Sequence, residues 1–205
     1  MLPFEQYLRD AAATGQVVNT MFEERLFELV GVLHRISAAL TSADVAHELV
    51  GGLAVFVHVE EVDPSQSMLT RDVDVMIRRE DLERVKEVAA RHGFRYRHAA
   101  SLDMLLYGDN DSARNAVHLL FAGEKVRPTQ ATANPEIRPE VKQILGAEVR
   151  VIPVSDLLRM KLSSFRLKDQ VHVQVMQASG LITAEVEGQL PSELQARLAQ
   201  VRSAD

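Results

Sequence analysis

The sequence predicts an α+β domain in which helices cover a β-sheet and a helical segment ends the chain. The order of predicted elements carries this interpretation: helix, strand, helix, strand, helix, several strands, then helices. A composition of 46% hydrophobic and 25% charged residues is ordinary for a globular chain of 205 residues, which suits one domain or one core with a small appendage. An α/β sandwich is the alternative. We expect an N-terminal helical extension over residues 1–45, the core over 46–154 and C-terminal helices over 155–205.

Periodicity and turn residues place the elements of the first half. Apolar residues at helical spacing predict an amphipathic helix, and a diglycine marks the end of a short strand. The expected elements are a helix over 22–40, a strand over 46–50 ending at Gly51-Gly52, a helix over 53–61, a polar loop over 62–71 and a strand over 72–77.

The second half reads as a meander of strands followed by helices. Its first helix has acidic residues early, basic residues late and Gly93 at its end. The expected elements are a helix over 79–93, strands over 94–100, 103–108 and 116–123, a loop-rich stretch over 123–148, a strand over 148–154, one long helix over 155–181 and a short helix over 191–202.

Charge and cysteine content exclude several classes of function. The chain has no cysteine, which excludes disulfides, zinc–thiolate sites and thiol catalysis. A net charge of −6 argues against coating nucleic acid with the whole surface, although a local basic pocket for phosphates is compatible with it. The first ten residues lack a signal-peptide pattern, and the most apolar stretch is too short to span a bilayer. We expect a cytoplasmic protein with no membrane contact.

The stretch "TRDVDVMI" raises the chemical question, because it places Asp72 and Asp74 one residue apart in a valine-rich strand. On a strand both aspartates share one face, roughly 6–7 Å apart, while Val73, Val75 and Ile77 share the other. Adjacent like charges repel, so a positive partner is expected between them. Paired carboxylates suit magnesium, which prefers oxygen ligands and substrate phosphates. The alternative is a solvated pair on an uncovered sheet face.

Two further features suit a phosphate ligand. Gly51-Gly52 lies between a strand and a helix, where backbone N–H groups can bind phosphate, although a simple tight turn explains it as well. On the expected helix over 155–181, Lys161 and Lys168 are seven residues apart and share a face, with Asp169 nearby. These lysines either reach a triphosphate or belong to a solvated helix face.

Together, "GG", an apolar helix, "TRDVDVMI" and "DLLRMKLSSFRLKDQVHV" resemble the polymerase-beta-type nucleotidyltransferase superfamily, including small bacterial branches with abortive-infection toxin enzymes. The resemblance covers roughly residues 46–180 and implies a nucleotidyltransferase-like mixed β-sheet. It implies Mg²⁺ or Mn²⁺ on Asp72 and Asp74. A nucleoside triphosphate is implied as substrate, bound by the residues Gly51, Gly52, Thr70, Lys161 and Lys168.

One position departs from the family pattern, which places a third carboxylate on a neighbouring strand. The matching strand is "AVHLLFAG", and the position holds His118. An imidazole can ligate a metal or accept a proton, but it removes a negative charge from the site. A hydrogen-bonded core histidine is the alternative. Asp103, Asp109, Asp111 and Glu124 can supply the carboxylate only if loops fold back.

Three functional hypotheses follow. The first is a nucleotidyltransferase that moves a nucleoside monophosphate onto a small molecule, an RNA or a protein, with Asp72, Asp74 and His118 as catalytic residues. The second is a catalytically inactive nucleotidyltransferase-like domain that binds a nucleotide or a partner. The third is an α+β domain with the aspartates on an open surface. A homodimer, or an antitoxin-like partner, is compatible with the first two.

Overall fold

The computed structural model describes residues 24–68, 70, 72–108 and 116–203. Residues 1–23, which hold most of the expected N-terminal extension and the first residues of its helix, lie outside the described part, as do Asp109 and Asp111. The first described element is a helix over 24–42. The labelled elements that follow are β1 (His47–Val50), α2 (Gly51–Val62), η1 (Pro64–Gln66), β2 (Val73–Ile77), η2 (Arg79–Asp81), α3 (Leu82–Arg91), β3 (Phe94–Ala99), β4 (Leu102–Tyr107), β5 (Ala116–Phe121), β6 (Glu140–Ile144), β7 (Ala147–Val151), α4 (Val154–Ser164), α5 (Leu167–Ala178), α6 (Ala184–Gly188) and α7 (Ser192–Ser203).

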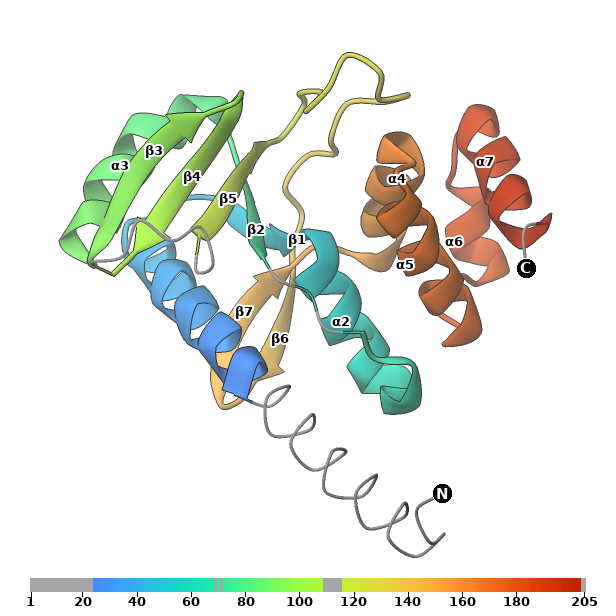
Figure 1. Ribbon diagram of the computed structural model, residues 1–205, viewed down its shortest axis with the longest axis horizontal. Coiled ribbons are helices and arrows are strands. Elements are labelled where there is room, and N and C mark those ends of the chain that lie inside the picture. The colour runs from blue at the N-terminus through green and yellow to red at the C-terminus, as the bar shows by residue number, and fades with distance from the viewer. Residues whose placement is uncertain (1–23, 69, 71, 109–115, 204–205) are drawn as a thin grey trace, which may run out of the picture.

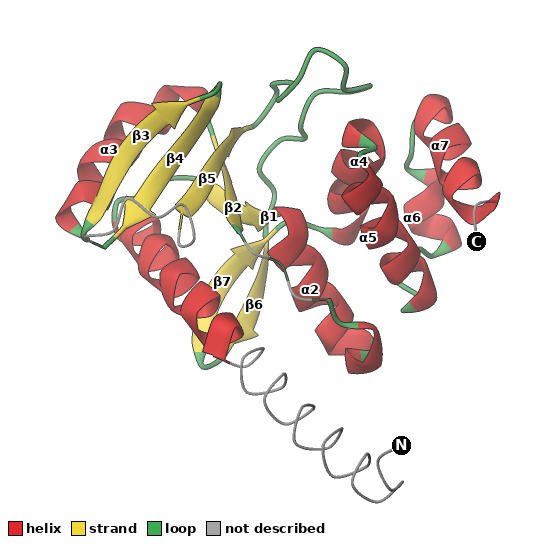
Figure 2. Cartoon of the chain, viewed as in Figure 1, coloured by secondary structure: helices red, strands yellow, loops and turns green. Residues whose placement is uncertain are grey.

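The strands form one seven-stranded mixed sheet in the order β3-β4-β5-β2-β1-β7-β6 (Figure 1). β2 is antiparallel to β1 and parallel to β5, and β3, β4 and β5 form the expected antiparallel meander. The α+β class is therefore confirmed. Figure 2 shows the helices α4–α7 gathered at one end of the molecule, away from β3 and α3.

One face of the sheet is apolar and covered by helices. Val73, Val75 and Ile77 of β2 are each at most 1% exposed, as their alternation predicts. The helix over 24–42 packs on this face, where the Arg35 guanidinium lies 4.9 Å from the ring centre of Tyr107. Burial of such side chains is the main stabilising contribution to the sheet.

Two predicted stretches differ from the structure. The loop-rich stretch over 123–148 contains β6, which forms a hairpin with β7 through a turn at Leu145-Gly146. The expected helix over 155–181 is two helices, because Phe165 takes a left-handed conformation with φ 52° between α4 and α5. Arg197 of α7 donates hydrogen bonds to the Leu162 and Ser163 carbonyls, which supplies donors to carbonyl groups that the end of α4 leaves without a partner inside the helix.

Among the residues that the structure describes, none of the helices combines the length and the apolar character needed to cross a bilayer.

Candidate active site

Asp74 lies in β2 beside the end of β1, and Asp72 directly precedes the strand. Within the sheet, Asp74 is paired with Val50 of β1 on one side and with His118 of β5 on the other. Val50 directly precedes the diglycine, so the topology brings Asp74 between His118 and the turn that begins α2. Asp72 directly precedes β2, and it is close enough for its charge to act on His118. β5 is therefore the neighbouring strand that the sequence predicts, and its His118 lies beside Asp74.

The two carboxylate oxygens of Asp74 face different neighbours. Oδ1 lies 3.2 Å from Nδ1 of His118, within hydrogen-bonding distance. Oδ2 lies against Gly51, where a Cβ atom would be only 1.9 Å from it. Gly51 also has φ +75°, a conformation that residues with a side chain rarely adopt. Glycine is thus required here for two reasons, backbone conformation and contact with the aspartate.

Gly52, Thr70 and His172 form the adjoining contact. A Cβ atom on Gly52 would lie 2.6 Å from Oγ1 of Thr70 and 3.3 Å from Cε1 of His172. Burial lowers the pKa of His172 to about 4, with the charge of Lys161 adding to the effect, so this ring is neutral at physiological pH. The contact places Thr70 directly beside the diglycine, and it holds α5 against the start of α2.

Asp74 and His118 shift each other's pKa in opposite directions. Burial by itself raises the pKa of Asp74, but the hydrogen bond and charge of His118, together with the charges of Lys161 and Lys168, outweigh it and leave the pKa below its usual value. The hydrogen bond to Asp74 raises the pKa of His118, opposed by burial and helped by the charges of Asp74 and Asp72. Positive charge near Asp74 comes from Lys161 and Lys168, and His118 adds to it when its ring is protonated.

Cations of the C-terminal helices, Lys161, Arg166 and Lys168, form one side of the site, here called the cationic wall. They do so from two helices and not from the single helix that the sequence predicts. Lys161 lies on α4 and Lys168 on α5, so the shared helical face is wrong, because the chain bends between them. Lys161 is 5% exposed, and its Nζ lies 3.4 Å from Oδ1 of Asp169. The other carboxylate oxygen of Asp169, Oδ2, accepts a hydrogen bond from Nε of Arg166 at 2.7 Å. Lys168 is exposed. Burial lowers the pKa of Lys161, against the charges of Asp169 and Asp74.

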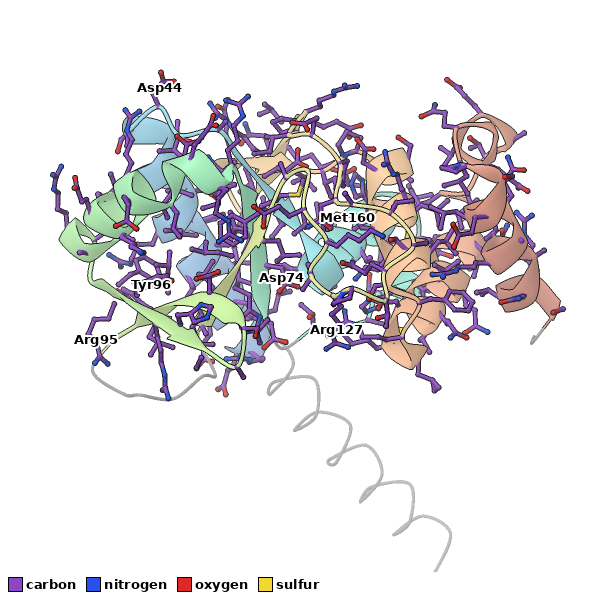
Figure 3. The ribbon with its side chains drawn as sticks, turned by 90° about the horizontal axis from the view of Figure 1, so that it is seen from above. Asp44, Asp74, Arg95, Tyr96, Arg127 and Met160 are labelled. Carbon is purple, nitrogen blue, oxygen red and sulfur yellow. The ribbon has the colours of Figure 1, made fainter. Side chains whose placement is uncertain are left out.

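Gly51, the two aspartates, His118 and the charged side chains of α4 and α5 line one cavity of about 450 Å³. It extends from Gly51 along the sheet to the loop over residues 122–139, between the strands and the C-terminal helices. Figure 3 shows Asp74, Arg127 and Met160, all of which line it, in this central region. The polar and charged residues of its lining are Asp72, Asp74, Arg79, Ser101, Asp103, His118, Glu124, Lys125, Arg127, Gln130, Asn134, Lys161, Ser164, Arg166, Lys168 and Asp169. The aspartates therefore border a concave site, which disfavours the interpretation of an open surface.

Arg79 organises the far part of this cavity, although no local pattern in the sequence indicates such a role. Its Nε and NH2 groups lie 2.9 and 2.6 Å from the two carboxylate oxygens of Glu124, and NH1 lies 3.5 Å from Asp103. Asp103 is paired with Leu119, so by alternation it faces the side of the sheet opposite to Asp74. Neither acid joins Asp74 as a third carboxylate, because both are engaged by Arg79.

The side chains at this site can hold a metal ion only if a substrate supplies further ligands. Among the described residues, no three His, Asp or Glu side chains converge as a metal-binding group. Asp72 and Asp74 nevertheless line the same cavity, and the pKa of Asp74 is lowered, so it offers a charged oxygen ligand. Magnesium often binds through one or two carboxylates and takes its remaining ligands from water and phosphates. The two aspartates fit such an ion.

Comparison with known proteins identifies the fold. No family model and no curated protein matches the chain. An antigenic nucleotidyltransferase-like protein from Paracoccidioides brasiliensis matches with a TM-score of 0.58 and 19% identity, over 86% of this chain and 88% of that one. The antibiotic-resistance factor ANT(2'')-Ia matches with a TM-score of 0.54 and 14% identity, over 85% of this chain and 91% of that one. Its complex with adenylyl-2''-tobramycin matches with a TM-score of 0.53 and 16% identity, over 85% and 97%.

The chain therefore has the nucleotidyltransferase fold, which confirms the fold implied by the sequence resemblance. At these identities the likeness is one of fold, and what the chain does is argued from its own site.

Proposed function

We propose that this protein transfers a nucleoside monophosphate from a nucleoside triphosphate to a hydroxyl acceptor, with Mg²⁺ or Mn²⁺ as cofactor. The observation that carries the proposal is the position of Asp74, whose carboxylate lies between His118 and the diglycine turn inside a cavity with a cationic wall. The fold shared with ANT(2'')-Ia, which has been solved in complex with adenylyl-2''-tobramycin, supports it.

The nucleotide would be bound by the turn and the wall. The N–H groups at the start of α2, at Gly51 and Gly52, suit a phosphate, with Thr70 beside them. The exposed cation of Lys168 and the partly exposed one of Arg166 suit the remaining phosphates. Asp72 and Asp74 would hold the metal ion, which supplies positive charge to the phosphates when bound.

The reaction would exchange one phosphorus–oxygen bond for another. The acceptor oxygen forms a bond to the α-phosphorus while the bond from that phosphorus to the bridging oxygen breaks, and pyrophosphate leaves with the electron pair. The acceptor hydroxyl loses its proton, for which His118 is the candidate base. When Nδ1 donates its hydrogen bond to Asp74, the neutral ring has Nε2 left to accept a proton.

Labelled transfer tests the proposal. The purified protein is incubated with Mg²⁺ and each of the four α-³²P-labelled ribonucleoside triphosphates, with total RNA, tobramycin or a mixture of sugars as acceptors, and pyrophosphate release is measured. Asp74→Asn is expected to lower the rate by about 100-fold or more. The matched control is Asp81→Asn, outside the cavity lining, which is expected to keep the wild-type rate. Equal rates in the two variants would refute the assignment.

A second candidate is a catalytically inactive protein of this fold that binds a nucleotide. The specific observation in its favour is His118, which pairs with Asp74 where a third carboxylate is expected. Isothermal titration separates the two: triphosphate binding that is lost in Gly51→Ala, without pyrophosphate release by the wild type, supports the inactive protein. Absence of both binding and release contradicts both candidates.

A further inference from the structure

The cavity continues beyond the aspartates to the loop over residues 122–139, which carries Lys125 and Arg127. We infer that this loop binds a phosphate group of the acceptor, so that the acceptor is a hydroxyl compound that itself carries phosphate. The inference rests on the proposed nucleotidyl transfer and specifies the class of its second substrate.

The loop has a defined shape, fixed by buried polar side chains. Gln130 is 7% exposed, and its Oε1 accepts hydrogen bonds from the backbone N–H groups of Val126 at 2.5 Å and Arg127 at 3.2 Å. Asn134, 4% exposed, donates from Nδ2 to the Phe121 carbonyl at 3.0 Å. A buried amide that organises neighbouring backbone groups holds those groups in place. The two cations are therefore carried on a preorganised segment.

The same loop is also attached to α4. The backbone N–H of Thr132 donates to Oγ of Ser163 at 2.9 Å, and that hydroxyl donates to the Thr132 carbonyl at 2.9 Å. Ser163 is 2% exposed. Because α4 also carries Lys161, these contacts fix the position of the loop relative to the cationic wall of the nucleotide site.

Ion pairing leaves the loop cations available. Arg79 is engaged by Glu124 and Asp103, while Lys161 and Arg166 are engaged by Asp169.

Within the part of the chain that the structure describes, the ion pairs include neither Lys125 nor Arg127, and both residues are exposed. Two such cations in one cavity of a protein with a net charge of −6 favour an anionic ligand.

The position along the sheet separates this region from the triphosphate site. The loop begins after Phe121, and β5 advances roughly 10 Å between His118 and Phe121. One acceptor molecule can therefore place a hydroxyl beside His118 and a phosphate at the loop. An aminoglycoside, which carries several ammonium groups, would be repelled there.

The experiment reverses the charge of the two loop cations and measures the KM for the acceptor and the Kd for the triphosphate. The variant is Lys125→Glu/Arg127→Glu. Its matched control is Arg84→Glu/Arg97→Glu, which changes the net charge equally at exposed positions outside the cavity lining. Four acceptors are compared with each α-labelled triphosphate: ribose 5-phosphate, a five-nucleotide oligoribonucleotide, ribose and tobramycin. Triphosphate affinity is measured separately by titration calorimetry.

The wild type is expected to label ribose 5-phosphate or the oligoribonucleotide, and which of the two distinguishes a sugar phosphate from an RNA end. The loop variant is expected to raise KM for that acceptor by about tenfold or more, with the triphosphate Kd within about twofold and the control unchanged. Labelling of ribose or tobramycin alone, or an unchanged KM in the loop variant, would overturn the inference.

Direct binding keeps the two proposals distinguishable. If no acceptor is labelled, nucleotidyl transfer fails, and calorimetric titration of the same four compounds decides the inference alone. Binding of a phosphorylated compound that is lost in the loop variant and kept in the control supports a phosphate site on the loop. No binding of either phosphorylated compound to the wild type overturns it.

Discussion

Glu48 lies in the central strand β1, on the same face of the sheet as Asp74, and is fully buried. Its Oε2 accepts a hydrogen bond from the backbone N–H of Arg138 at 3.0 Å, while Oε1 has no partner among the described residues. Burial raises the pKa of Glu48 to about 7, opposed by the Arg138 hydrogen bond and helped by the charge of Asp156. Replacing Glu48 by glutamine removes the charge and keeps an oxygen that accepts the hydrogen bond.

The size of the stability change caused by Glu48 follows from proton linkage. The folded state holds the proton up to about pH 7, whereas an ordinary glutamate releases it at 4.5, so the folded state binds more protons between these values. Stability is therefore full below pH 4.5 and decreases as the pH rises through 7. The difference of about 2.5 in pKa corresponds to about 3 kcal/mol of lost stability above pH 7. Glu48→Gln should recover most of it.

Urea unfolding followed by circular dichroism at pH 5 and pH 8.5 measures the effect. We expect Glu48→Gln to be more stable than the wild type by about 2–3 kcal/mol at pH 8.5 and by much less at pH 5. The exposed Glu80→Gln serves as the control and should differ from the wild type by less than about 0.5 kcal/mol at both values. A Glu48→Gln protein that is equally or less stable than the wild type at pH 8.5 would refute the reasoning.

Three further variants test the site itself. Gly51→Ala should destabilise the protein by about 1–2 kcal/mol or more and abolish triphosphate binding, because the new side chain combines a positive φ with a clash at Asp74. A triphosphate affinity equal to that of the wild type in calorimetry would contradict this. Asp169→Asn should lower the free energy of unfolding in urea by about 3 kcal/mol, because it leaves Lys161 buried without its counter-charge. Adding Lys161→Met to this variant should restore most of the lost stability. No recovery would assign the effect to helix capping. The pKa of His118 measured by NMR should lie above 6.5 and return towards 6.5 in Asp74→Asn. The stability that this pair contributes is therefore present below pH 6.5 and lost as the pH rises through the raised pKa. Identical titration curves in the two proteins would disprove the pairing.

Local patterns in the sequence were sufficient for most of the fold. Alternation along β2 separates Val73 and Val75, which are buried, from Asp74, because side chains on a strand point to opposite faces. The diglycine correctly marks the transition from β1 to α2, and the helix, strand and meander order leads to the sheet. The break at Phe165 was missed, because a left-handed phenylalanine has no sequence signal and the bond from Arg197 to the end of α4 comes from a distant helix.

The sequence by itself determined which residue types are available and how they alternate along each strand and helix: the paired aspartates, the glycines and the lysines. The tertiary structure alone decided that Asp74 meets His118, that Arg79 engages Glu124, and that Glu48 is buried. The physical reason is that these contacts join segments far apart in the chain. Their geometry depends on strand order and register, which local propensity does not encode.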